Sequence, residues 1–134
     1  MAEVGPDELV YDLGCGDGRI IVTAARRYGA RAVGIELDPL RYLWCQLLIT
    51  FLGLRDRVQI VFGNFFKLDL SEADVVTCYL LRDTNKKLQG KFKDELCPET
   101  RIVSNYFTFP ELQLASEDKE EKLYLYSLNN NTVR

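Results

Sequence analysis

Apolar residues along the chain occur in short continuous runs, and these alternate with longer stretches where apolar positions recur at helical spacing. The runs predict strands buried on both faces, and the longer stretches predict helices between them. The predicted strands cover residues 9–14, 31–37, 58–64, 73–81 and 101–107. The predicted helices cover residues 18–29, 39–52 and 84–96. This alternation is typical of a doubly wound, mostly parallel α/β sheet.

The last part of the chain has a different pattern. In residues 111–128, "ELQLASEDKEEKLYLYSL", apolar and polar positions alternate on either side of a charged centre. This predicts an antiparallel hairpin at one edge of the sheet. A chain of 134 residues is long enough to bury one sizeable core, so we expect a single domain over residues 1–134.

The helix expected over residues 39–52 is apolar almost all the way round. Leu40, Leu43, Leu47 and Phe51 fall on one stripe, which we expect to face the core. The remaining residues leave little polar surface. We therefore expect part of Leu40–Leu52 to be covered by a second copy of the chain, by a missing N-terminal segment or by a membrane-protein substrate.

Composition narrows the chemistry. Apolar residues make up 47% of the chain and charged residues 28%, as in globular proteins. The net charge of −3 and the pI of about 5.0 disfavour nucleic-acid binding driven by overall charge. The chain has no histidine, which excludes catalytic dyads that use one.

The cysteines are widely spaced and form no CxxC pair, so neither a metal site nor a disulfide framework is expected. They are Cys15, Cys45, Cys78 and Cys97. Free thiols of this kind, with no visible signal peptide, indicate a reducing, cytoplasmic location.

Three glycines, Gly14, Gly16 and Gly18, follow the first strand and precede the first helix. Glycine lets the backbone turn sharply and lie against a ligand. A dinucleotide fingerprint, GxGxxG, would need its third glycine at position 19, where this chain has Arg19. A P-loop is excluded because no Lys-Ser/Thr pair follows.

Carboxylates surround this turn. Asp12 precedes the first glycine, Asp17 lies inside the turn, and Glu36 ends the second strand. They would repel a pyrophosphate, whereas they suit a cationic ligand with a ribose, such as S-adenosylmethionine. The simpler alternative is a tight strand-to-helix connection with solvated acids. Glu36, together with Asn64 after the third strand, favours the cofactor.

The stretches "YDLGCGDGRI" and "VGIELDP" resemble the class I S-adenosylmethionine-dependent methyltransferases. Later stretches, "GNFFKLDLSEADVVTCYLL", "KLQGKFKDEL" and "RIVSNYFTFP", resemble the small archaeal protein lysine methyltransferases and the lysine methyltransferases of the ATP synthase c-ring protein. The resemblance implies a Rossmann-like methyltransferase fold. It implies cofactor contacts at Asp12, Gly14, Cys15, Gly16, Gly18, Glu36, Leu37, Asn64, Phe65, Tyr79 and Leu80.

Within that resemblance, Glu36 would bind the ribose, Leu37 and Phe65 would lie beside the adenine, and Asn64 would meet its amino group. Tyr79 and Leu80 would border the methyl donor. We expect Tyr79, Asn105 and Tyr106 to be the catalytic, substrate-side polar groups.

Two features depart from the family. Its members carry a helical segment before the first strand that helps to cover the cofactor, and here only residues 1–8 precede it. We therefore expect this cover segment to be missing. Relatives also often carry an acidic residue where this chain has "SNYF".

The function expected is methylation of a lysine on a protein substrate in the cytoplasm, with no metal and no nucleic acid. Two alternatives remain. One keeps the cofactor but has a small molecule or RNA as the acceptor. The other is a cofactor-binding module with little turnover.

Overall fold

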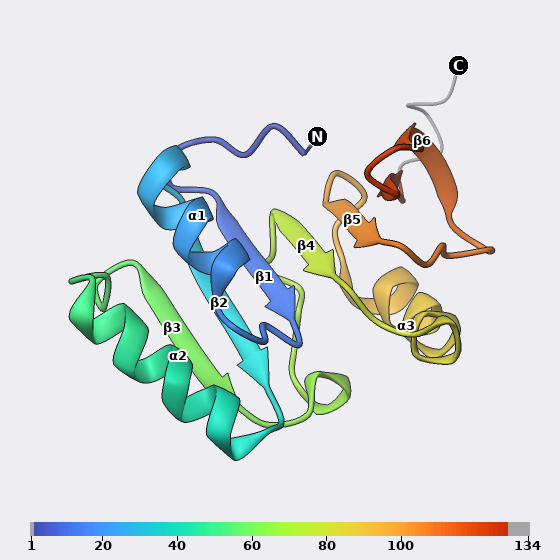
Figure 1. The fold of residues 1–134 in the computed structure, drawn as a ribbon. Coiled ribbons are helices and arrows are strands. Elements are labelled where there is room, and N and C mark those ends of the chain that lie inside the picture. Colours follow the sequence, from blue (N-terminus) through green and yellow to red (C-terminus); the bar gives the residue numbers. More distant parts are fainter. Residues whose placement is uncertain (1, 129–134) are drawn as a thin grey trace.

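The computed structural model describes residues 2–128, which form a seven-stranded sheet with helices packed against it (Figure 1). The strands are β1 (Leu9–Leu13), β2 (Arg31–Glu36), β3 (Val58–Phe62), β4 (Val75–Cys78), β5 (Arg101–Asn105), β6 (Gln113–Asp118) and β7 (Leu123–Ser127). The helices are α1 (Arg19–Tyr28), α2 (Pro39–Phe51) and α3 (Arg82–Glu95), with a short 3-10 helix η1 (Phe65–Lys67). The strand order is β3-β2-β1-β4-β5-β7-β6.

The centre of the sheet is β1, which pairs in parallel with β2 on one side and β4 on the other. At its carboxyl end, Leu13 lies opposite Ile35 of β2 and Cys78 of β4. The chain runs outward from β1 to β3 and then returns to β4, so the strand order reverses between β1 and β4. In open α/β sheets, ligands bind beyond the carboxyl ends of the strands at such a reversal.

Alternate residues of the strands feed two buried clusters on opposite faces of the sheet. One cluster includes Ile21 of α1 and Cys45 of α2, and Figure 1 shows both helices in front of β1, β2 and β3. The other includes Leu88 and Phe92 of α3, which are fully buried. The predicted doubly wound sheet is therefore confirmed.

The ends of the helices follow from local chemistry. Gly29 ends α1 in the left-handed region, with φ of 67°, and its N–H donates to the carbonyl of Ala24. Asp38 begins α2, and its carboxylate accepts hydrogen bonds from the N–H groups of Leu40 and Arg41. Pro39 occupies the first turn, where no intrahelical donor is lost.

The antiparallel hairpin is also confirmed. Strand β7 runs antiparallel to β5, with Leu123 opposite Asn105, and β6 forms the edge. Tyr126 of β7 is buried, and its hydroxyl accepts a hydrogen bond of 3.0 Å from the N–H of Phe109. This contact fixes the loop between β5 and β6 against the sheet.

The expected orientation of α2 is wrong. Leu40, Leu43, Leu47 and Phe51 are 77%, 55%, 68% and 87% exposed, and the buried residues of this helix are Cys45 and Ile49. The other side of α2 packs against the glycine turn, where Cys45 Sγ and Leu48 Cδ2 would each lie 3.4 Å from a Cβ on Gly18. These side chains fill the space against the turn, so the stripe of Leu40, Leu43, Leu47 and Phe51 faces outward.

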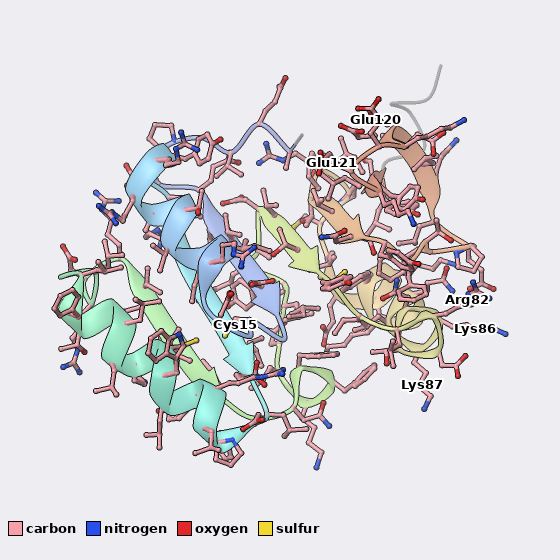
Figure 2. The ribbon with its side chains drawn as sticks, in the orientation of Figure 1. Cys15, Arg82, Lys86, Lys87, Glu120 and Glu121 are labelled. Carbon is pink, nitrogen blue, oxygen red and sulfur yellow. The ribbon has the colours of Figure 1, made fainter. Side chains whose placement is uncertain are left out.

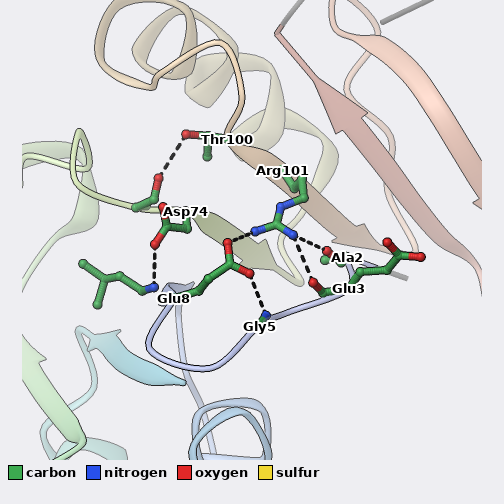
Figure 3. A network of polar contacts seen from close by, with 9 residues as sticks. Ala2, Glu3, Gly5, Glu8, Asp74, Thr100 and Arg101 are labelled. Atoms are coloured by element: carbon green, nitrogen blue, oxygen red, sulfur yellow. Dashed lines mark hydrogen bonds and ion pairs between the residues drawn. The ribbon is translucent and has the colours of Figure 1, made fainter. Parts of the chain in front are cut away.

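The segment before β1 is held at the opposite end of the sheet from the carboxyl ends of the parallel strands (Figure 3). Arg101 pairs with Glu8 and donates to the carbonyls of Ala2, at 2.7 Å, and Glu3, at 3.1 Å. Glu8 also accepts a hydrogen bond of 2.6 Å from the N–H of Gly5. This network ties residues 2–8 to β5.

Candidate functional site

A tight turn connects β1 to α1 at the strand-order reversal. Gly14 and Gly16 both lie in the left-handed region, with φ of 73° and 56°. The N–H groups of Gly14 and Cys15 both donate to the carbonyl of Ile35, at 2.8 and 3.1 Å. The turn is therefore pinned to the end of β2 and exposes backbone, with no Cβ at these glycines, beyond the sheet.

Glu36 is 7% exposed, and its carboxylate is the acceptor that organises this turn. One oxygen, Oε1, accepts from the N–H of Gly16 at 2.8 Å. The other, Oε2, accepts from the N–H groups of Leu37 and Asp38, at 3.1 and 3.0 Å. Each carboxylate oxygen can accept two hydrogen bonds, so Oε1 retains capacity for a ligand hydroxyl.

A cavity of about 430 Å³ opens beyond the carboxyl ends of the parallel strands. This volume lies within the range of small-molecule sites, ~300–1,000 Å³. The cavity is lined by Gly14, Ile35, Glu36, Leu37, Arg41, Gly63, Asn64, Phe65, Phe66, Tyr79, Leu80 and Thr84. A Cβ on Gly63 would meet nothing within 4 Å, so the chain is open there.

Seven of the residues expected at a cofactor site therefore line one cavity: Gly14, Glu36, Leu37, Asn64, Phe65, Tyr79 and Leu80. Asn64 begins η1, and its Oδ1 accepts a hydrogen bond of 2.9 Å from the N–H of Phe66. The lining residues that the sequence analysis did not single out include Arg41, Phe66 and Thr84. Each of them follows the end of a predicted strand by a few residues. That position could have marked them as candidates for the site.

Asp12 is not part of the cavity lining and lies beneath it, 3% exposed. Its Oδ1 accepts a hydrogen bond of 2.8 Å from Thr77 Oγ1. The pKa of Asp12 is raised to about 7, mainly by burial and to a lesser degree by the charges of Glu36 and Asp17, against the Thr77 hydrogen bond, which lowers it. The carboxyl is therefore poised between its neutral and ionised forms near neutral pH.

Cys15, Gly16 and Gly18 also do not line the cavity. Cys15 Sγ is 3.9 Å from Cys45 Sγ, and Figure 2 shows Cys15 in the turn between β1 and α1. Cys45 donates to the carbonyl of Gly16 at 3.2 Å. The contact with Cys45, together with burial, raises the pKa of the Cys15 thiol, so it stays protonated and does not act as a nucleophile.

Of the three residues expected on the substrate side, only Tyr79 lines the cavity. Tyr79 follows β4, lines the cavity and is 62% exposed. Asn105 and Tyr106 lie at the end of β5 and do not line the cavity. The N–H of Tyr106 donates to the carbonyl of Lys122 at 2.7 Å, and the Lys122 ammonium lies 4.3 Å from the centre of its ring.

A residue that the sequence analysis missed is Asn85 of α3, which is fully buried. Its amide nitrogen donates to Ser104 Oγ and to the carbonyls of Phe107 and Thr108, at 3.4, 3.2 and 3.4 Å. Asn85 therefore positions the loop that contains Asn105 and Tyr106. The signal was a polar residue in register with the buried stripe of α3.

Comparison with known proteins identifies the class. The profile of the ANTKMT methyltransferase domain matches residues 12–116. The chain belongs to this methyltransferase family. Membership confirms the S-adenosylmethionine-dependent methyltransferase class that the sequence predicted.

Individual relatives refine this picture. The chain is 48% identical over 108 residues to a protein-lysine N-methyltransferase of Saccharolobus islandicus, covering 80% of this chain and 67% of that protein. It is 28% identical over 102 residues to the lysine N-methyltransferase of the ATP synthase c-ring protein from Xenopus laevis, covering 76% of this chain and 45% of that protein. The chain thus spans less than half of the latter relative.

A crystal structure of an RNA methyltransferase from Salinibacter ruber with S-adenosyl-L-homocysteine is also similar. It is 37% identical, has a TM-score of 0.91, and the match covers 96% of this chain and 86% of that chain.

Among residues 2–128, no group of three or more histidine, cysteine, aspartate or glutamate side chains is placed to hold a metal ion. Across the same residues, no helix combines the length and the apolar character that crossing a membrane requires.

Proposed function

We propose that the protein is an S-adenosylmethionine-dependent methyltransferase whose acceptor is a lysine side chain of another protein. The observation that carries the proposal is the 48% identity, over 80% of this chain, to an archaeal protein-lysine N-methyltransferase. The family match and the similarity to a lysine methyltransferase of the ATP synthase c-ring protein support the same acceptor. We also propose that residues 1–134 act as one domain, in the cytoplasm.

The cofactor is proposed to lie in the cavity beyond β1, β2, β3 and β4. The residues present fit its chemistry, because a buried carboxylate with spare acceptor capacity on one oxygen suits a ribose hydroxyl. Glu36 would hold the ribose through Oε1. Leu37 and Phe65 would flank the adenine, and the Oδ1 of Asn64 has a second lone pair for its amino group.

The methionine end is proposed to lie along the glycine turn. Asp12, Asp17 and Glu36 place negative charge near this end, which favours a ligand that carries ammonium and sulfonium groups. Gly14 and Gly16 would offer backbone rather than side chains. Cys15 and Gly18 would act indirectly, because they shape the turn beneath the ligand.

Bound S-adenosylmethionine supplies a methyl group activated by its sulfonium. Tyr79, Asn105 and Tyr106 would align the lysine amine with this methyl group, and such alignment can contribute up to ~7–11 kcal/mol. A free lysine has a pKa near ~10.4 and must lose its proton before attack. Desolvation beside Tyr79 and Leu80 would lower that pKa, so no histidine base is needed.

The test is transfer of a labelled methyl group from S-adenosylmethionine into a fractionated cell lysate, followed by mass spectrometry of the labelled band. The expected result is methyl-lysine in a protein. The same assay with Glu36→Ala should give little label, because the ribose contact is lost. Label found only on RNA or a small metabolite would contradict the lysine acceptor.

An RNA acceptor is the second candidate, favoured by the similar RNA methyltransferase structure. Arg82, Lys86 and Lys87 are exposed on α3, and Figure 2 shows them pointing away from the sheet. The same helix contributes Thr84 to the cavity lining, although none of the three basic residues lines the cavity. Ribonuclease treatment of the labelled lysate separates the candidates: label in RNA is lost, and label in protein remains.

A cofactor-binding module with little turnover would show a different pair of results. Calorimetry would detect binding of S-adenosylmethionine, while no protein, RNA or metabolite fraction would become labelled.

The protein partner is proposed to include whatever covers the apolar outer face of α2. The sequence predicts three candidate occupants of this face: a second copy of the chain, a missing N-terminal segment or a membrane-protein substrate. The geometry of the face favours the second copy.

A further inference from the structure

The outward face of α2 carries five large apolar side chains that are each more than half exposed. They are Leu40, Leu43, Trp44, Leu47 and Phe51. The only charged residue of the helix is Arg41. A contiguous apolar patch without interspersed charges is uncommon on a monomeric protein and marks an interaction surface.

Four residues of this patch have the same spacing along the sequence in either direction. Leu40, Trp44, Leu47 and Phe51 are separated by four, three and four residues. We infer that two copies of the chain associate through antiparallel packing of their α2 helices about a two-fold axis. With the axis between positions 45 and 46, Leu40 faces the partner's Phe51, and Trp44 faces the partner's Leu47.

Charge is compatible with this arrangement. Arg41 lies opposite the partner's Thr50, so the two Arg41 guanidinium groups are at opposite ends of the interface. Antiparallel helices also place the N-terminal end of each macrodipole beside the C-terminal end of the other.

The area available is close to what a stable dimer requires. From their exposed fractions, the five side chains present on the order of 600 Å² of surface per copy. A standard interface buries about 800 Å² per partner, somewhat more than this patch presents. An interface of this size predicts a dimer that dissociates on dilution.

The dimer would also act on the cofactor cavity. Trp44 Nε1 donates to the carbonyl of Asp17 at 3.3 Å, so α2 holds the glycine turn directly. At the other end of the stripe, Arg41 lines the cavity, and the partner's Phe51 would pack beside the neighbouring Leu40. Packing of two α2 helices would therefore steady both the turn and the cavity rim.

This coupling rests on the proposed cofactor site, whereas the dimer itself does not. Because coupling between two binding events is reciprocal, S-adenosylmethionine should tighten the dimer by the factor by which dimerisation tightens cofactor binding.

The first experiment measures molar mass by sedimentation across the micromolar range of protein concentration. The parent should move from monomer to dimer as concentration rises, and Leu47→Glu should remain a monomer with an unchanged circular dichroism spectrum. The matched control is Leu114→Glu, an exposed leucine on β6 that should dimerise as the parent does. A parent that stays monomeric, or a Leu47→Glu variant that dimerises, overturns the inference.

The second experiment tests the register by oxidative cross-linking in a Cys97→Ser background, which removes the exposed thiol. Leu40→Cys/Phe51→Cys should form a covalent dimer. Its two new thiols are about 16 Å apart within one helix and cannot pair within a chain. Either single variant should stay uncross-linked. Cross-linking of a single variant would contradict the antiparallel register.

A lipid or membrane-protein surface, one of the other candidate occupants, gives its own outcome. A parent that is monomeric in solution and binds phosphatidylcholine vesicles, with binding lost in Leu47→Glu, would assign the face to a membrane and overturn the dimer. Methyl transfer by a monomer would leave the proposed function intact.

Discussion

The buried carboxylate of Asp12 accepts a hydrogen bond of 2.8 Å from the hydroxyl of Thr77, which joins β1 to β4 where the strand order reverses. This places an ionisable group directly beneath the glycine turn. Burial favours the neutral form of Asp12. The stability of the folded protein therefore depends on whether Asp12 is ionised.

Asp12→Asn should change how stability depends on pH. The pKa of Asp12 is about 7 in the folded protein against an ordinary value of 3.8, so the stability that its neutral form contributes is full below pH 3.8. This contribution to the unfolding free energy, on the order of 4 kcal/mol, is lost as pH rises through about 7. Asparagine keeps an acceptor for Thr77 and never ionises.

The measurement is urea unfolding of parent and variant from pH 4 to pH 8. The parent should lose stability relative to Asp12→Asn as pH rises. Thr77→Val removes a contact that holds the pKa down, and should move the parent's transition to higher pH. Parallel stability profiles for parent and Asp12→Asn would contradict the assignment.

The preference of the site for a charged ligand should also depend on the ionisation of Asp12. S-adenosylmethionine carries a sulfonium charge that S-adenosylhomocysteine lacks, so ionised Asp12 should favour the former. Calorimetry at pH 6 and pH 8 should show the affinity ratio of the two ligands rising several-fold at the higher pH. In Asp12→Asn the ratio should stay constant, and a constant ratio in the parent would exclude Asp12 from charge recognition.

Much of the fold follows from local patterns in the sequence, and the parts that do not follow have physical reasons. Gly29 marks the end of α1 and Pro39 the start of α2 through their own backbone chemistry, so these two helix boundaries could be predicted from the sequence. The orientation of α2 was wrong because a helix that is apolar all round gives no periodic signal. The packing of Cys45 and Leu48 against the glycine turn accompanies the observed orientation, and that packing exists only in the folded chain.

The candidate site also combines features that the sequence predicts with features that only the folded chain creates. Glu36 was predicted as a ligand from its position at a strand end. Its three hydrogen bonds to backbone N–H groups depend on how β2 and the turn meet, which no spacing encodes. Asn85 was missed for a similar reason, since its partners lie in β5 and directly after it, about twenty residues later in the chain.

Glu36→Gln should weaken both the turn and cofactor binding. Hydrogen bonds to a charged acceptor contribute about 1.5–3 kcal/mol, and glutamine offers one acceptor oxygen in place of two. We expect a loss of about 2 kcal/mol in unfolding free energy and at least a tenfold weaker affinity for S-adenosylmethionine by calorimetry. The control is Glu72→Gln, an exposed carboxylate that should change neither quantity. A Glu36→Ala variant that bound the cofactor like the parent would remove the ribose assignment.

Asn85→Leu should release the loop after β5. It removes the amide that binds Ser104 and the carbonyls of Phe107 and Thr108, at a cost of about 1–3 kcal/mol. Hydrogen exchange should rise at Phe107, and kcat should fall more than the KM for S-adenosylmethionine changes. Lys86→Ala, exposed on the same helix, is the control and should leave loop exchange unchanged. Unaltered exchange in Asn85→Leu would show that Asn85 does not position the loop.

Arg101→Met should free residues 2–8 from the sheet while leaving the cofactor cavity intact. Arg101 and Glu8 are both partly buried, at 28% and 29% side-chain exposure, and the guanidinium also holds two backbone carbonyls. Because exposure screens the pair, we expect a loss of only about 1–2 kcal/mol in unfolding free energy. Limited proteolysis should cleave near Gly5 earlier than in the parent, and calorimetry should give an unchanged affinity for S-adenosylmethionine. The control is Arg19→Met, which removes the ion pair between Arg19 and Asp17. These two side chains are 83% and 61% exposed, so the control should lose less than about 0.5 kcal/mol in unfolding free energy. Equal losses in both variants would mean that the network of Arg101 contributes no more than a surface ion pair.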